Sequence, residues 1–232
     1  NPCLGSHTMS EGLLSLLEAS VKTGVRKFVY VSSSMVYGNF RDVYFDGIPE
    51  THECNPIGQY GIMKYMGEQL VKDYARKYGF EYVIIRPSAV YGEYDVEDRV
   101  VSKFMLGALR GETLKVNGES ETLDFTYVED AAAGIVGAAL SKNANNKTYN
   151  ITKSHSFTLL RAAEIAVALA GKGNIEVRAK DADFPSRGAL NIDAARNDFG
   201  YDPKVDVEEG FRRYHKWFTE SKYWQQKLNT PS

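Results

Sequence analysis

A tyrosine and a lysine one helical turn apart are the residues of this chain best suited to proton transfer. Tyr60 and Lys64 stand at positions i and i+4, so a helix would place both side chains on one face. A free tyrosine has a pKa of about 10 and is a poor base at neutral pH, but a nearby ammonium favours the phenolate. Such a phenolate can take the proton of a sugar hydroxyl while the carbinol carbon is oxidised to a ketone.

Hydroxyl groups that could assist this chemistry follow a short apolar strand. The run Phe28-Val-Tyr-Val leads directly into Ser32, Ser33 and Ser34. A serine at the end of a neighbouring strand can donate a hydrogen bond to the same sugar oxygen, or accept one from it. Phenol, ammonium and alcohol together form a coherent site for interconverting alcohols and ketones.

The tyrosine–lysine spacing alone is weak evidence because it recurs twice. Tyr149 and Lys153 lie where a strand ends, so they would share no helical face. Tyr223 and Lys227 lie near a polar C-terminus, with no hydroxyl-bearing strand before them. Tyr60 alone follows a strand, a serine triplet and a loop, and begins a helix.

The elements around this motif alternate in type. Helices are predicted over 6–23 and 60–78, strands over 27–32 and 81–86, and a polar loop over 38–57. The apolar run from Lys27 to Ser32 predicts a strand that is buried on both faces, as in parallel sheets. Helix–strand alternation implies right-handed crossovers and a doubly wound α/β fold.

The character of the chain changes after Gly92, where shorter elements follow. Helices are predicted over 99–110, 129–142, 158–171 and 207–225, and strands over 113–116, 122–126, 147–151 and 175–178. We therefore expect a sheet domain over 1–92, to which 124–151 returns, and a smaller α+β substrate lobe from 93–123 and 152–232.

Composition excludes several classes of function. The net charge of −2 and the lack of basic runs give no case for nucleic acid or a membrane surface as partner. Cys3 and Cys54 lack disulfide or metal-ligand patterns, which indicates a reducing compartment, and we expect a cytoplasmic protein. The four histidines are scattered without paired-ligand spacing, so no metal site is predicted: His7, His52, His155 and His215.

Together these motifs resemble the extended short-chain dehydrogenase/reductase family, particularly its nucleotide-sugar epimerases, dehydratases and decarboxylases. The resemblance covers nearly the whole chain and is carried by the following segments: Ser32-Ser-Ser-Met-Val-Tyr-Gly38, Tyr60 with Lys64, Arg86-Pro-Ser-Ala-Val-Tyr-Gly92, Asp124-Phe-Thr-Tyr-Val-Glu-Asp130 and Gly200-Tyr-Asp-Pro203. It implies a partial Rossmann-like parallel sheet and NAD as cofactor, with NADP not excluded.

The resemblance also implies roles for single residues. Ser33 matches the catalytic serine or threonine, Tyr60 the acid and base, and Lys64 the residue that holds the ribose hydroxyls. Expected cofactor contacts are Ser32, Tyr60, Lys64, Pro87, Ala89 and Val90. Expected substrate contacts are Ser34, Met35, Ala89, Arg99 and Arg187, the two arginines toward a nucleotide-sugar diphosphate because guanidinium donors fork.

Several positions depart from the family pattern. Dehydratases and decarboxylases usually carry an acid where Met35 stands, and dehydratases a second acid where Ser34 stands. Their replacement disfavours acid-assisted elimination and leaves epimerisation or ketone reduction. Ala89 replaces a frequent substrate-contacting Asn, and Leu123 replaces an arginine that would face the diphosphate.

The glycine-rich phosphate loop of the family does not occur in these residues. The nearest approach, Gly134-Ile-Val-Gly137, lies inside a helical pattern with no strand before it. We expect a part of a longer enzyme. The alternatives are a chain completed by another polypeptide or by exchange between copies, and a non-catalytic ligand-binding relative without dinucleotide binding.

The sequence thus predicts an NAD-dependent nucleotide-sugar epimerase-type protein. An NAD(P)H-dependent nucleotide-sugar 4-ketoreductase is the alternative enzyme. The resemblance further implies a homodimer that packs helices 6–23 and 59–78 into a four-helix bundle.

Overall fold

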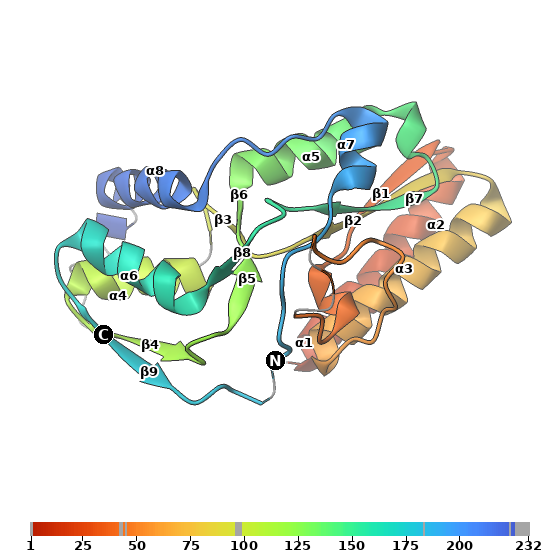
Figure 1. The fold of residues 1–232 in the computed structure, drawn as a ribbon. Helices are drawn as coiled ribbons and strands as arrows, with labels where there is room; N and C mark the ends of the chain where they lie inside the picture. Colours follow the sequence, from red (N-terminus) through yellow and green to blue (C-terminus); the bar gives the residue numbers. More distant parts are fainter. Residues whose placement is uncertain are drawn as a thin grey trace.

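The larger part of the molecule is built around a parallel sheet. The computed structural model describes residues 2–41, 44, 46–95, 99–182, 184–222, 224 and 225. Its strand order is β1 (Lys27–Val31), β2 (Glu81–Pro87) and β7 (Lys147–Ile151) (Figure 1). Val31 lies opposite Ile85, and Ile85 opposite Tyr149. Because all three strands are parallel, their carboxyl ends meet at one edge, which confirms the predicted α/β fold.

Helices cover both faces of this sheet, as Figure 1 shows. On one face α2 (Leu13–Thr23) and α3 (Gly58–Tyr78) pack against Phe28 and Tyr30 of β1. On the other face α5 (Val128–Leu140) and α7 (Asp193–Phe199) pack against a cluster that includes Val29, Ile85 and Tyr149. The alternation of Phe28, Val29 and Tyr30 between the two faces follows from the two-residue period of a strand.

Strand β1 is more exposed than the sequence predicted. The prediction of a strand buried on both faces is wrong here, because the residues of β1 are only partly buried and Val31 is 40% exposed. In the described ranges β1 pairs only with β2, so it forms an edge of the sheet. Strand β2, with neighbours on both sides, is fully buried from Val83 to Arg86.

The helix predicted over 6–23 is one part of a longer helical run. It comprises α1 (Pro2–His7), a π-helical turn η1 (Thr8–Gly12) and α2, which ends at Gly24 in a left-handed conformation. The helix predicted over 60–78 is α3, which begins two residues earlier at Gly58. Within the described ranges, none of the helices combines the length and apolarity that crossing a bilayer requires.

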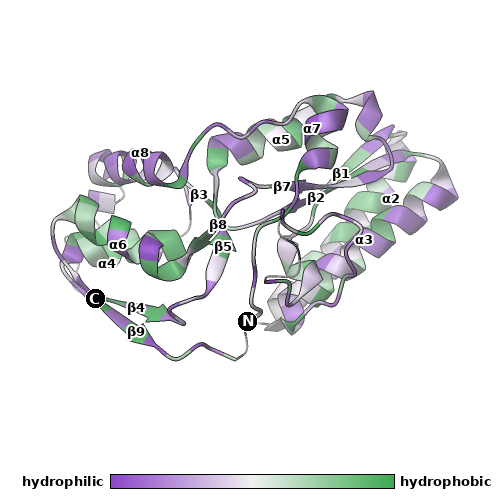
Figure 2. Ribbon diagram, viewed as in Figure 1, coloured by the Kyte–Doolittle hydropathy of each residue, from purple (hydrophilic) through white to green (hydrophobic). Residues whose placement is uncertain are grey.

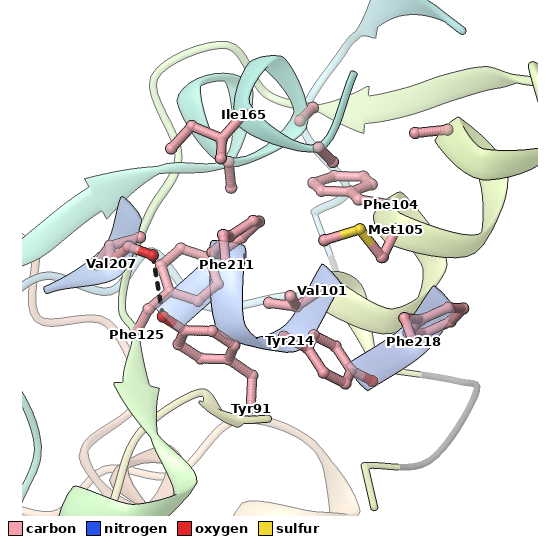
Figure 3. Packing of buried hydrophobic residues seen from close by; sticks show 14 of the residues in the cluster. Tyr91, Val101, Phe104, Met105, Phe125, Ile165, Val207, Phe211, Tyr214 and Phe218 are labelled. Carbon is pink, nitrogen blue, oxygen red and sulfur yellow. Dashed lines mark hydrogen bonds between the residues drawn. The ribbon is translucent and has the colours of Figure 1, made fainter. Parts of the chain in front are cut away.

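A second apolar cluster lies between three helices of the smaller half. It joins α4 (Val100–Arg110), α6 (Leu159–Ala170) and α8 (Val207–Glu220). Figure 3 shows the aromatic rings of α8 facing Phe104 and Met105 of α4, with the Tyr91 hydroxyl donating to the Val207 carbonyl at 3.2 Å. In Figure 2 the visible surface of α8 is mostly hydrophilic, as expected for a helix with one buried face.

Three further pairs of short strands lie outside the three-stranded sheet in the described ranges. β3 (Val90–Tyr91) pairs with β6 (Thr126–Tyr127), β4 (Thr113–Asn117) with β9 (Asn174–Arg178), and β5 (Thr122–Asp124) with β8 (Ser156–Thr158). The single strand predicted over 122–126 is therefore divided at Phe125, because β5 pairs antiparallel with β8 while β6 pairs parallel with β3. Strand β8 and helix α7 were not predicted.

Two predicted helices end earlier in the structure. The helix predicted over 129–142 stops at Leu140 and is followed by a 3₁₀ turn, η3 (Lys142–Ala144). The helix predicted over 207–225 stops at Glu220, where Ser221 adopts an extended conformation.

Candidate active site

The serine triplet lies at the carboxyl end of β1, where the chain turns into a 3₁₀ helix, η2 (Ser34–Tyr37). Ser33 is the extended residue that begins this turn, and its Oγ accepts a hydrogen bond of 3.2 Å from the Met35 amide. Ser34 is buried, and its Oγ has no hydrogen-bond partner in the structure. The turn therefore carries two successive hydroxyls: that of Ser33 accepts a hydrogen bond, and that of Ser34 has no partner among the described residues.

Tyr60 and Lys64 lie in the first two turns of α3, directly beside this serine turn. A Cβ added to Gly61 would stand 2.7 Å from the Met35 carbonyl oxygen, so only glycine allows the helix to approach η2 this closely. Lys64 Nζ donates to the Val31 carbonyl oxygen at 2.8 Å and lies 5.8 Å from the Tyr60 ring centroid. The tyrosine itself is 45% exposed.

Burial changes the acidity of two groups in this region. It lowers the pKa of the half-buried Lys64 ammonium below its ordinary value. It also raises the pKa of Tyr30 to about 12, and the nearby Glu68 and Tyr60 add to this effect. Tyr30 therefore remains a neutral phenol at physiological pH, and its hydroxyl donates to the Lys64 carbonyl oxygen at 3.4 Å.

The segment after β2 faces the serine turn across the strand ends. Ala89 has a φ of 36°, a left-handed conformation that costs a non-glycine residue about 1–2 kcal/mol. Its carbonyl oxygen accepts a hydrogen bond from the Thr126 amide at 3.3 Å, which links this segment to β6. Ser88, just before it, is buried, and its Oγ has no hydrogen-bond partner in the structure.

These segments line one cavity of about 1200 Å³. All residues predicted for cofactor or substrate contact lie on its wall: Ser32, Ser33, Ser34, Met35, Tyr60, Lys64, Pro87, Ala89, Val90, Arg99 and Arg187. The volume exceeds the several hundred Å³ that a single drug-sized ligand fills, so the cavity has room for more than one such ligand. The structure thus brings together every residue that the sequence analysis selected.

The two predicted arginines lie in the part of the cavity formed by the smaller half. Arg99 precedes α4, is 60% exposed and lies 3.9 Å from Asp95 Oδ1. The Nε of Arg187 is buried and has no hydrogen-bond partner among the described residues. Burial lowers the pKa of its guanidinium to about 10, although Glu121 opposes the shift. A cation held in this way is a candidate for an anionic ligand.

Leu123, which stands where the family pattern has an arginine, lies on the same wall, together with lysines that the sequence analysis did not select. These are Lys103, Lys115 and Lys180. Only their positions in the folded chain identify them, because they come from α4, β4 and the segment after β9.

The pair Tyr149 and Lys153 does not form a comparable site. Tyr149 is buried in β7 and donates to Asp198 Oδ2 at 2.5 Å, while Lys153 Nζ donates to the Pro203 carbonyl oxygen. Tyr223 and Lys227 lie outside the described residues. In the part of the chain that the structure describes, no three His, Cys, Asp or Glu side chains converge as metal ligands would.

Sequence analysis missed the charged groups behind the site. Glu68 of α3 and Arg86 of β2 form a buried ion pair with an Oε2–Nη2 distance of 2.6 Å, and the Ser32 hydroxyl donates to Glu68 Oε1 at 2.6 Å. A signal for Glu68 was present, because it follows Tyr60 and Lys64 at the same four-residue interval. The partnership with Arg86 could not be read from spacing alone.

Comparison with known proteins agrees with this geometry. The family model described as the NAD dependent epimerase/dehydratase family matches residues 6–152. A putative UDP-glucose 4-epimerase of Methanocaldococcus jannaschii is 31% identical over 228 residues, which are 94% of this chain and 71% of that protein.

Solved structures show the same likeness. The UDP-glucose 4-epimerase of Thermotoga maritima, solved with UDP-glucose, has a TM-score of 0.85 at 30% identity, over 95% of this chain and 72% of that one. The UDP-glucose 4-epimerase of Thermus thermophilus, solved with NAD, has a TM-score of 0.84 at 26% identity, over 92% of this chain and 70% of that one. The family model matches residues 6–152, which is more than half of the chain, so this chain belongs to the NAD-dependent epimerase/dehydratase family.

Proposed function

We propose that this protein inverts a carbinol carbon of a nucleotide sugar, with Tyr60 and Ser33 as the residues that exchange the hydroxyl proton. One observation carries the proposal: a phenol, an ammonium and an alcohol from β1 and α3 line a single cavity at the carboxyl edge of a parallel sheet. Tyr60 accepts the proton as phenolate and returns it as phenol, while Ser33 bonds the same sugar oxygen.

The residues present fit the nicotinamide half of NAD. NAD, when bound, supplies the acceptor and donor of the hydride. Among the described residues Lys64 Nζ donates one hydrogen bond, to the Val31 carbonyl oxygen, which leaves two of its three donors for ribose hydroxyls. The nicotinamide ring would lie against apolar and backbone walls formed by Pro87, Ala89, Val90 and Ser32, the residue that follows β1.

The opposite wall suits the sugar and its diphosphate. Ser34, Met35 and Ala89 would contact the sugar, and Arg99 and Arg187 the phosphates. Positions 34 and 35 carry Ser and Met where dehydratases carry acids, which favours epimerisation over dehydration. UDP-glucose is the first substrate to test, because the relatives named above carry it in their names.

We also propose a division into two units, a dimer interface and a cellular location. The sheet unit comprises 1–92 and 124–151, and the substrate lobe 93–123 and 152–232, in keeping with the separate apolar clusters around β2 and α4. A homodimer through α2 and α3 is supported by Leu16 and Ile62, which are 61% and 52% exposed on those helices. The free thiol of Cys54 supports a cytoplasmic location.

An assay of the intact protein with UDP-glucose and NAD tests the proposal. We expect conversion to the 4-epimer without net change in reduced-nicotinamide absorbance, because oxidation and reduction alternate on one bound cofactor. Stoichiometric consumption of added reduced cofactor by a 4-keto sugar nucleotide would instead establish a ketoreductase. A Tyr60→Phe variant that still supports the cellular role would establish a non-catalytic binding protein. A light-scattering mass of one chain would contradict the dimer.

A further inference from the structure

A buried ion pair lies directly behind the candidate catalytic residues. Glu68 of α3 is fully buried, and Arg86 of β2 is 3% exposed. The carboxylate accepts two hydrogen bonds from the guanidinium, Nε to Oε1 at 2.9 Å and Nη2 to Oε2 at 2.6 Å. Two well-packed apolar side chains often stabilise a core as much as such a pair does, so stability alone does not account for it.

The carboxylate also holds the end of the serine strand. The Ser32 hydroxyl donates to Glu68 Oε1 at 2.6 Å, and one residue earlier the Val31 carbonyl oxygen accepts from Lys64 Nζ at 2.8 Å. Lys64 and Glu68, one helical turn apart on α3, therefore form hydrogen bonds to two consecutive residues at the end of β1. The next residue along the chain is Ser33.

The guanidinium continues the connection to the far end of the serine turn. The Arg86 guanidinium carbon lies 4.7 Å from the Tyr37 ring centroid, and the Tyr37 hydroxyl donates to Asn150 Oδ1 at 2.8 Å. Arg86 Nη1 donates to the Glu50 carbonyl oxygen at 3.2 Å. Burial opposes the charge of Arg86, but its hydrogen bonds to Glu68 hold its pKa above the ordinary value. The turn from Ser33 to Tyr37 is thus fixed at both ends.

We propose that Glu68 is a positioning residue that sets the register of α3 against the end of β1, and thereby the placement of Tyr60 relative to Ser33. Tyr60, Lys64 and Glu68 occupy positions i, i+4 and i+8, so a fixed carboxylate fixes both the rotation and the translation of the face that carries the phenol. This inference rests on the proposed function, because it assigns Glu68 a task only if Tyr60 and Ser33 act on one sugar oxygen.

The test compares Glu68→Gln with the parent in the intact protein. The amide keeps the size of the side chain but turns one donor toward the Arg86 guanidinium, which breaks the paired geometry. We expect kcat to fall by about 10-fold to 100-fold with KM nearly unchanged, the effect of misplacing a catalytic group by about 1 Å.

Two further variants separate positioning from stability. Val71→Ala loosens the same helix at a fully buried site outside the network, so it should lower the unfolding midpoint while kcat and KM stay as in the parent. The double variant Glu68→Met/Arg86→Leu restores an apolar core and serves if Glu68→Gln does not fold. A folded double variant with low kcat and parental KM supports positioning.

The contrary results are equally distinct. A Glu68→Gln variant with parental kcat overturns the inference. A loss of kcat that Val71→Ala reproduces also overturns it, as does a loss that disappears when the double variant restores the stability of the core. If Tyr60→Phe retains full activity, the proposed function itself fails. If Tyr60 is essential but Glu68 changes only the unfolding midpoint, the positioning role alone fails.

Discussion

The Lys64 ammonium lies 5.8 Å from the ring centroid of Tyr60 and is tethered by a 2.8 Å hydrogen bond to the Val31 carbonyl oxygen. The hydrogen bond keeps the ammonium near the phenol, and among the described residues no carboxylate forms an ion pair with it. Burial lowers the pKa of this lysine below its ordinary value. In the proposed reaction this charge would act at short range on the phenol of Tyr60 and on the hydroxyl of a bound sugar.

Replacing Lys64 by methionine should separate its charge from its packing. Lys64→Met removes the ammonium that lies 5.8 Å from the Tyr60 ring centroid, so the pH profile of kcat/KM should move to higher pH. Activity at neutral pH should fall by about 10²-fold or more. A control at Lys72, on the same helix but outside the cavity, should leave the profile unchanged in Lys72→Met. An unshifted profile in Lys64→Met would remove the proposed role of the ammonium.

Arg187 should contribute to the affinity for the diphosphate. Its Nε is buried without a hydrogen-bond partner, so an anionic ligand would satisfy it. In Arg187→Met, calorimetry should show UDP binding weakened by about 10-fold to 100-fold, the value of a hydrogen bond to a charged group. Arg196, exposed on α7 and paired with Asp193, provides the control, and Arg196→Met should bind UDP normally. Equal affinity in both variants would place the phosphates elsewhere.

Ala89 should tolerate glycine better than other alanines do. Its φ of 36° is strained for a residue with a Cβ, and glycine relieves that strain by about 1 kcal/mol while adding unfolded-state entropy of similar size. We expect the free energy of unfolding of Ala89→Gly to equal or exceed that of the parent. Ala133→Gly, at an exposed position inside α5, should lose about 1 kcal/mol. Chemical denaturation measures both, and an equal loss in the two variants would contradict the strained geometry.

Asp124 should make stability depend on pH. Burial raises its pKa to about 7, although hydrogen bonds that include the Leu190 amide oppose the shift. The folded state therefore binds a proton that the unfolded state has lost between pH values of about 4 and 7, so this contribution is complete below about 4 and disappears as the pH rises through 7.

Asp124→Asn should remove that dependence, because an amide is neutral throughout this range. Relative to the parent, the variant should gain free energy of unfolding as the pH rises from about 4 to 7. Asp198→Asn should show the opposite trend, and only below pH about 4, because Lys147 holds the pKa of the Asp198 carboxyl below its usual range and this contribution is lost as the pH falls. Parallel curves for Asp124→Asn and the parent would show that the buried carboxyl does not retain its proton.

Sequence patterns selected residues that share one cavity because their signals are local. An apolar strand that ends in Ser33, and a helix that begins near Tyr60, are specified within a few residues of each motif. Arg187 was found only through resemblance, since its distance from Tyr60 along the chain hides their shared cavity. The conformation of Ala89 is set by its link to β6 and has no signature in its residue type.

The ion pair of Glu68 and Arg86 illustrates what sequence patterns leave out. Each residue alone is a common charged side chain, and their burial follows only from the packing of α3 on β2. The division of the strand at Phe125 has the same origin, because the choice of β8 or β3 as partner is made by tertiary structure. Long-range pairing overrides local propensity in both cases.

The proposed role of Tyr60 as acid and base is tested by the rate of nucleotide-sugar epimerisation in Tyr60→Phe, measured beside Tyr78→Phe. Tyr78 lies at the far end of α3 and is similarly exposed, so the two variants lose the same atom from the same helix. We expect a loss of about 10²- to 10⁴-fold for Tyr60→Phe at unchanged unfolding midpoint, and parental activity for Tyr78→Phe. Parental activity in a folded Tyr60→Phe variant would contradict this role.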